Sequence, residues 1–96
     1  MTTIHPSKER RSLGRSDIQV SPIAWGMWRF SSDELSEAQE RVEAALDAGI
    51  TLFDTADIYG ADTPAGFGSA EARLGRVLKA APHLRPEMVI ATKGGI

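Results

Sequence analysis

Short apolar runs alternate with amphipathic stretches along most of this chain, and that alternation limits the folds open to it. Apolar runs of strand length occupy residues 23–25, 50–53 and 88–92, and helical periodicity occupies residues 33–48 and 69–81 between them. Buried strands of a parallel sheet read as continuous apolar runs, whereas covering helices show a single apolar stripe. The alternation therefore predicts an α/β fold with three buried strands in a parallel sheet built from right-handed βαβ units.

Local signals support these boundaries. Ser31 and Glu34 have the spacing of a capping box at the start of the first helix, and Gly49 is a stop signal at its end. Pro82 and Pro86 bracket a connector after the second helix.

The residues before the first strand carry a separate signal. Turn formers at Gly14, Ser16 and Asp17 predict a small hairpin over residues 10–20. We expect residues 1–8 to form a flexible N-terminal tail and residues 9–96 to form one domain.

Composition excludes several function classes. The chain has 96 residues, 42% hydrophobic and 25% charged, and its net charge of -2 gives no global attraction to nucleic acid or anionic lipid. It has no cysteine, which excludes disulfides, thiolate nucleophiles and cysteine-based metal sites. The N-terminus shows no signal peptide, and no apolar run approaches the length of a membrane span. We therefore expect a cytoplasmic protein with no metal site, no nucleic-acid partner and no membrane association.

Two parallel architectures can be separated by where the polar residues stand. A doubly wound dinucleotide-binding sheet needs a glycine-rich phosphate loop after its first strand, and Gly26 is followed by Met27 and Trp28 instead. In a β/α barrel, chemistry lies at the C-terminal strand ends. Asp54 ends the second predicted strand, Tyr59 follows in the next loop, and Lys93 ends the third strand.

This trio permits a specific chemistry. A free tyrosine has a pKa near ~10, which is high for a proton donor at neutral pH. A neighbouring ammonium favours the phenolate, and an aspartate paired with the lysine holds that ammonium in place. We interpret Tyr59 as a general acid, Lys93 as its tuner and Asp54 as the orienting group for protonation of a carbonyl oxygen.

These residues lie within motifs that resemble a known family. The stretch FDTADIYG at residues 53–60 is the most specific motif, supported by LGRS at 13–16, SPI at 21–23, GMW at 26–28 and ATK at 91–93. From about residue 10 to residue 96 the chain resembles the N-terminal part of the aldo-keto reductases, most closely their poorly characterised bacterial members.

The resemblance implies a (β/α)8 TIM barrel, of which this chain is the N-terminal portion, and NADP(H)-dependent reduction of aldehydes and ketones to alcohols. It implies catalytic roles for Asp54, Tyr59 and Lys93. The residues it implies at the cofactor are Gly26, Met27, Trp28 and Asp54, and those at the small-molecule carbonyl substrate are Trp28 and Tyr59. The family's fourth catalytic residue, a histidine, is expected beyond Ile96. His5 in the tail and His83 in the connector do not match it.

Three interpretations of function remain open from the sequence. The first is a carbonyl reductase whose full-length form is active while these 96 residues alone, as a truncated barrel, are inactive. The second is a non-catalytic binding subunit on the same fold, and the third is a decayed gene product without activity. The sequence does not identify the carbonyl substrate, because the loops that select it belong mainly to later strands.

Overall fold

The computed structural model of this chain describes residues 8–30 and 34–95. Five strands are present within them, and they form two separate sheets. An antiparallel hairpin contains β1 (Arg11–Ser12) and β2 (Gln19–Val20). A parallel sheet in chain order contains β3 (Ala24–Gly26), β4 (Leu52–Asp54) and β5 (Val89–Ala91). The predicted hairpin and the predicted parallel sheet are therefore both confirmed.

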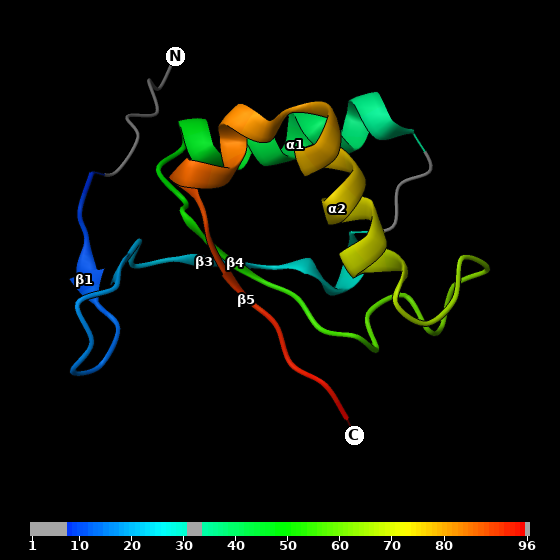
Figure 1. Cartoon of the computed structure of the whole chain (residues 1–96), viewed down its shortest axis with the longest axis horizontal. Helices are drawn as coiled ribbons and strands as arrows, with labels where there is room; N and C mark the ends of the chain where they lie inside the picture. The colour runs from blue at the N-terminus through cyan, green and yellow to red at the C-terminus, as the bar shows by residue number, and fades with distance from the viewer. Residues whose placement is uncertain (1–7, 31–33, 96) are drawn as a thin grey trace, which may run out of the picture.

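Two helices make the crossovers of the parallel sheet, α1 (Leu35–Asp47) and α2 (Ser69–Ala80). Both lie on one side of the strands in Figure 1. One residue from each strand shares a register row and packs toward these helices: Trp25, Phe53 and Ile90. Phe53 is fully buried, and its ring lies 5.7 Å from that of Trp25, centroid to centroid.

The expectation of fully buried strands is wrong in part. Phe53 is the one fully buried residue among these three strands, whereas Ala24, Gly26 and Ala91 are exposed. Side chains alternate across a strand, so the neighbours of the buried row point to the opposite face. No described helix covers that face (Figure 1). The opposite face of the sheet is therefore partly exposed to solvent, although the strands are apolar.

The element boundaries differ slightly from the predicted ones. Helix α1 begins at Leu35 with Glu34 as its N-cap and without a side-chain cap, so Glu34 does not act as the third helical residue of a capping box. Ser31 of that box and residues 1–7 of the predicted tail, residues 1–8, lie outside the described residues. Gly49 has φ of +91°, a left-handed conformation that ends the helix as predicted.

The predicted connector after α2 is more ordered than expected. Residues Pro82–Glu87 form a 3-10 helix, η2, and Met27–Arg29 form another, η1, directly after β3. Proline fixes φ near the helical value, so Pro82 at the first position of η2 favours a helical turn as well as a break. The buried Leu84 anchors η2 to the core.

Ser21 joins the starts of two parallel strands. Its hydroxyl oxygen accepts hydrogen bonds from the amides of Thr51 (2.9 Å) and Leu52 (3.2 Å), and the hydroxyl donates to the Ile23 carbonyl (2.7 Å). The Ser21 amide in turn donates to the Thr51 hydroxyl at 3.0 Å. This buried serine therefore fixes the register in which Gly26 and Asp54 end side by side.

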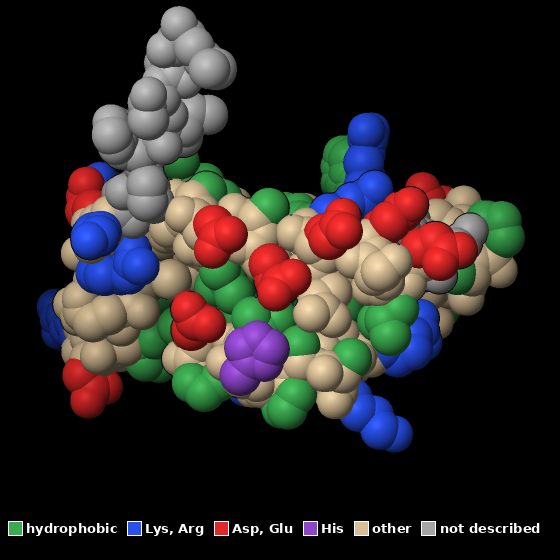
Figure 2. Space-filling view, turned by 90° about the horizontal axis from the view of Figure 1, so that it is seen from above, with side chains coloured by type: hydrophobic (Ala, Val, Ile, Leu, Met, Phe, Trp, Pro, Cys, Tyr) green, Lys and Arg blue, Asp and Glu red, His purple; other side chains and the backbone are tan. Residues whose placement is uncertain are grey.

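The outer surface of the helices is polar. Figure 2, viewed from the helix side, shows acidic side chains spread over this face. Glu37, Glu40 and Asp47 of α1 are exposed, as expected for an amphipathic helix that buries Ala38 and Val42. Among the described residues, no helix is long and apolar enough to cross a membrane.

Candidate active site

Asp54 and Lys93 meet at the C-terminal edge of the parallel sheet. Asp54 is the last residue of β4, and its register partner in β5 is Ala91, two positions before Lys93. The Lys93 Nζ donates to Asp54 Oδ1 at 2.7 Å and to the Thr55 carbonyl at 3.0 Å. The predicted pairing of these two side chains is therefore present. Lys93 lies just beyond β5 rather than in its last position, because β5 ends at Ala91.

Tyr59 lies beside this pair. The Lys93 Nζ is 5.0 Å from the centre of the Tyr59 ring, so the ammonium lies over the aromatic face. The hydrogen bond to Asp54 raises the pKa of Lys93 above its ordinary value, and the Tyr59 side chain acts in the same direction. Lys93 therefore stays protonated at neutral pH, and one cation contacts both other members of the trio.

The backbone around Tyr59 is held from both sides. The Tyr59 amide donates to the Ala56 carbonyl (3.2 Å), and the Ala70 amide of α2 donates to the Tyr59 carbonyl (3.2 Å). Gly60 follows with φ of +102°, a conformation that favours glycine. A Cβ at Gly60 would overlap the Ser69 hydroxyl, so this glycine lets α2 begin directly under the tyrosine loop.

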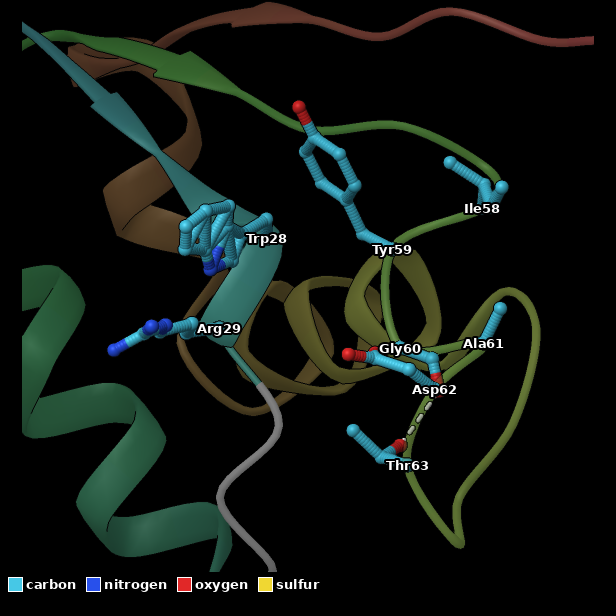
Figure 3. Close-up of a pocket in the computed structure, with 8 residues that line it drawn as sticks. All are labelled: Trp28, Arg29, Ile58, Tyr59, Gly60, Ala61, Asp62 and Thr63. Atoms are coloured by element: carbon cyan, nitrogen blue, oxygen red, sulfur yellow. Dashed lines mark hydrogen bonds between the residues drawn. The ribbon is translucent and has the colours of Figure 1, made fainter. Parts of the chain in front are cut away.

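A cavity of about 740 Å³ opens next to Tyr59. Its lining residues come from η1 and from the loop after β4: Trp28, Arg29, Ile58, Tyr59, Gly60, Ala61, Asp62 and Thr63. In Figure 3 the rings of Trp28 and Tyr59 stand on opposite sides of this space, and the Thr63 hydroxyl bonds the Gly60 carbonyl (2.6 Å). Trp28 is 54% exposed, and the Arg29 guanidinium lies 4.7 Å from its ring centre. The cavity thus combines an aromatic wall with charged and hydroxyl groups.

The first-strand residues predicted for the cofactor lie in different places. Trp28 lines the cavity, and Gly26 is exposed at the strand end, beside Asp54 in the register. The Met27 side chain is fully buried in the hydrophobic core and does not join the trio. Helix η1 packs on α2 with one face, which buries Met27, while the next residue, Trp28, lies on the exposed face.

Other residues at the site were not singled out for it by sequence reasoning. From sequence, Asp57 suits a turn and Glu71 suits the first turn of a helix, yet each side chain accepts a hydrogen bond from the segment that carries Lys93. Arg29 has the pattern of an ordinary surface charge in the sequence, and in the structure it lines the cavity with Asp62. The sequence signal that could have identified these residues is their position in the segments that follow strand ends. Such segments also carry ordinary caps and turns, so the signal is weak. Within the described part of the chain, no cluster of three acidic or histidine side chains could hold a metal ion.

Comparison with known proteins decides the family. The aldo/keto reductase family model matches residues 22–96, which includes all three members of the trio. The chain belongs to the aldo/keto reductase family. Among curated relatives, the chain is 61% identical over 88 residues to a 6-dehydroglucose reductase of Novosphingobium aromaticivorans, covering 90% of this chain and 29% of the relative. A 6-dehydroglucose reductase of Agrobacterium fabrum is 46% identical over 82 residues, covering 82% of this chain and 26% of the relative.

Solved structures agree with this aldo/keto reductase assignment. The holo form of an aldo-keto reductase from Bacillus halodurans matches with a TM-score of 0.67 and 29% identity, covering 90% of this chain and 26% of that one. The fold is therefore the N-terminal portion of a (β/α)8 barrel, as predicted. The chain spans less than a third of the length of each of these relatives.

Proposed function

We propose that this chain is the N-terminal part of an NADP(H)-dependent reductase that converts an aldehyde or ketone to an alcohol. Tyr59 is the general acid in this proposal, Lys93 is the cation that tunes it, and Asp54 holds that cation. The supporting observation is the shared position of Lys93, with its Nζ 2.7 Å from Asp54 Oδ1 and 5.0 Å from the Tyr59 ring centre. The trio stands at the strand ends, where β/α barrels carry their chemistry.

The residues at the strand ends fit the nicotinamide end of a dinucleotide. Asp54 lies in register between Gly26 and Ala91, two small residues that leave its carboxylate accessible to a ribose hydroxyl. A Cβ built at Gly26 meets nothing within 4 Å, so the strand end is open above the sheet. The exposed Trp28 ring offers an apolar surface beside this opening. The chemistry that a nicotinamide coenzyme would supply, if held here by Asp54 and Trp28, is hydride for the carbonyl carbon.

The chain's own residues have three tasks in this reaction. Tyr59 transfers its hydroxyl proton to the carbonyl oxygen as negative charge develops there. Lys93 places a positive charge beside the tyrosine, which stabilises the phenolate that remains. Asp54 and the Thr55 carbonyl each accept a hydrogen bond from the Lys93 ammonium and keep it in this position.

The cavity chemistry supports a polar carbonyl substrate. The two curated relatives described above are 6-dehydroglucose reductases, so we propose a sugar that carries an aldehyde or ketone. The aromatic face of Trp28 suits the apolar face of a sugar ring. Asp62 and Thr63 line the same cavity and can bond sugar hydroxyls.

The direct test is Tyr59→Phe in the barrel-length reductase that carries this sequence. Loss of the proton donor should lower the turnover of 6-dehydroglucose by roughly 10²–10⁴-fold, while NADPH affinity, measured by fluorescence titration, stays near the parent value. Full turnover in Tyr59→Phe would overturn the assignment of the acid. Replacement of the exposed Phe67 by Leu is the control for an aromatic change outside the trio.

The proposal also covers the isolated chain and its location. These 96 residues alone should show no reductase activity, because they supply three strands of the barrel and three of the four expected catalytic residues. A cysteine-free sequence fits a reducing compartment, and we place the reductase in the cytoplasm.

A further inference from the structure

The segment that carries Lys93 lies beyond the sheet and is exposed throughout. Strand β5 ends at Ala91, and residues 92–95 all lie on the surface. A lysine side chain is long and flexible, so the position of its ammonium depends on how firmly its backbone is held. The structure shows what holds this backbone.

Two acidic residues bond the Lys93 segment on either side of the lysine. Before it, the Thr92 hydroxyl donates to Glu71 Oε2 at 2.5 Å. After it, the Gly95 amide donates to Asp57 Oδ2 at 3.2 Å. The lysine's own carbonyl accepts a hydrogen bond from the Asp57 amide at 3.0 Å.

Asp57 links this segment to the tyrosine loop. It stands two positions before Tyr59, and its carbonyl accepts from the Gly68 amide at 2.8 Å, just before α2. Glu71 stands in the first turn of that helix. The same two residues therefore connect the loop of Tyr59, the start of α2 and the segment of Lys93.

We propose that Asp57 and Glu71 are positioning residues that fix Lys93 relative to Tyr59. Neither contacts the reacting atoms, and each acts through the Lys93 backbone. The inference rests on the proposed function, which makes Lys93 the partner of the acid. Both carboxylates could otherwise be explained as a turn residue and a helix-start charge, and those roles do not require bonds to Thr92 and Gly95.

The test uses matched pairs of variants in the barrel-length reductase. Thr92→Val removes the hydroxyl and keeps the shape, while Thr92→Ser keeps the hydroxyl. Asp57→Ala removes the acceptor, while Asp57→Asn keeps an acceptor oxygen. A displacement of about 1 Å can cost about 10²-fold in rate. We therefore expect Thr92→Val and Asp57→Ala to lower the single-turnover rate by roughly tenfold to hundredfold, with substrate KM and NADPH affinity little changed.

A second measurement does not depend on activity. Labelling of Lys93 by an amine-reactive reagent, read by peptide mass spectrometry, should become faster in Thr92→Val and Asp57→Ala because the ammonium leaves its hydrogen bonds. Thr92→Ser and Asp57→Asn should restore most of the parent rate and protection. Glu40→Gln and Asp47→Asn, exposed on α1, are the controls for loss of a carboxylate.

The results separate this inference from the proposed function. Parent-like turnover in Lys93→Met would overturn the proposed function itself. An inactive Lys93→Met with unchanged rates and labelling in Thr92→Val and Asp57→Ala would overturn the positioning inference alone. The positioning inference also fails if Thr92→Ser loses as much rate as Thr92→Val, since the hydroxyl then has no part in the effect.

Discussion

Asp54 shows how much a single position can decide. It is the last residue of the central strand, and alternation turns it away from the side on which Phe53 is buried. Its register neighbours on both sides, Gly26 and Ala91, are small. The carboxylate is therefore 43% exposed and free to take the Lys93 ammonium.

Gly60 has a constraint that its neighbours do not share. Gly60→Ala should destabilise the barrel-length reductase by about 1–3 kcal/mol from the left-handed backbone conformation alone, and more from overlap with the Ser69 hydroxyl. Gly75→Ala is the matched control, because that glycine is helical, has open space around it, and should gain roughly 0.5–1 kcal/mol. Urea unfolding measures both, and equal stability of the two variants would contradict the constraint.

The contribution of Lys93 to the free energy of unfolding should depend on pH in a definite direction. Its pKa is raised above 10.5 in the folded protein, mainly by the hydrogen bond to Asp54. The stabilisation is therefore fully present below the ordinary lysine pKa, and it is lost as pH rises through the folded value. The unfolding free energy of the parent minus that of Lys93→Met should stay constant from pH 7 to about 10 and decline above that.

Lys79→Met, on the exposed side of α2, is the control for loss of a lysine charge. A parent-minus-Lys93→Met difference that declines between pH 7 and pH 9 would contradict the raised pKa.

The helices show why periodicity predicted some elements better than others. Helices α1 and α2 each have one apolar stripe, which includes Val42 in α1 and Leu74 in α2. Both stripes pack against the sheet residues in the row of Phe53. Over twelve or more residues that stripe leaves little ambiguity. The six-residue helix η2 carries too few turns for a stripe, and its two prolines read as breaks.

Leu74 tests the core between the helices and the sheet. It is 4% exposed within the central cluster, and Leu74→Ala should lower the free energy of unfolding by about 2–5 kcal/mol. Leu35→Ala is the matched control, since Leu35 is 39% exposed at the start of α1 and should change stability by less than about 0.5 kcal/mol. Urea unfolding measures both variants. Similar decreases in their free energies of unfolding would contradict the assignment of Leu74 to the hydrophobic core.

At the scale of the whole molecule, the parallel sheet has two edges and one uncovered face. Among the described strands, β3 and β5 each pair on one side only. Ile23 is 66% exposed just before β3, and Trp25 and Ile90 are partly exposed. Parallel sheets are stable when both faces are covered, and unpaired edges template association.

We therefore expect an isolated polypeptide of these 96 residues to associate or aggregate. Size-exclusion chromatography with light scattering should show species larger than the 10.4 kDa monomer, and calorimetry should show no cooperative transition. A monomer with a sharp, reversible melt would contradict this expectation.

The sequence by itself determined the two helices, the parallel order of the three strands and the placement of Asp54, Tyr59 and Lys93 at or just beyond strand ends, because these follow from local periodicity and motif spacing. The tertiary structure decided which side chains meet. It turned Met27 into the core, and it brought Thr92 to Glu71 and Gly95 to Asp57 across 21 and 38 positions of sequence. Such contacts depend on strand register and on the crossover of α2, and local propensity carries no information about distances of that kind.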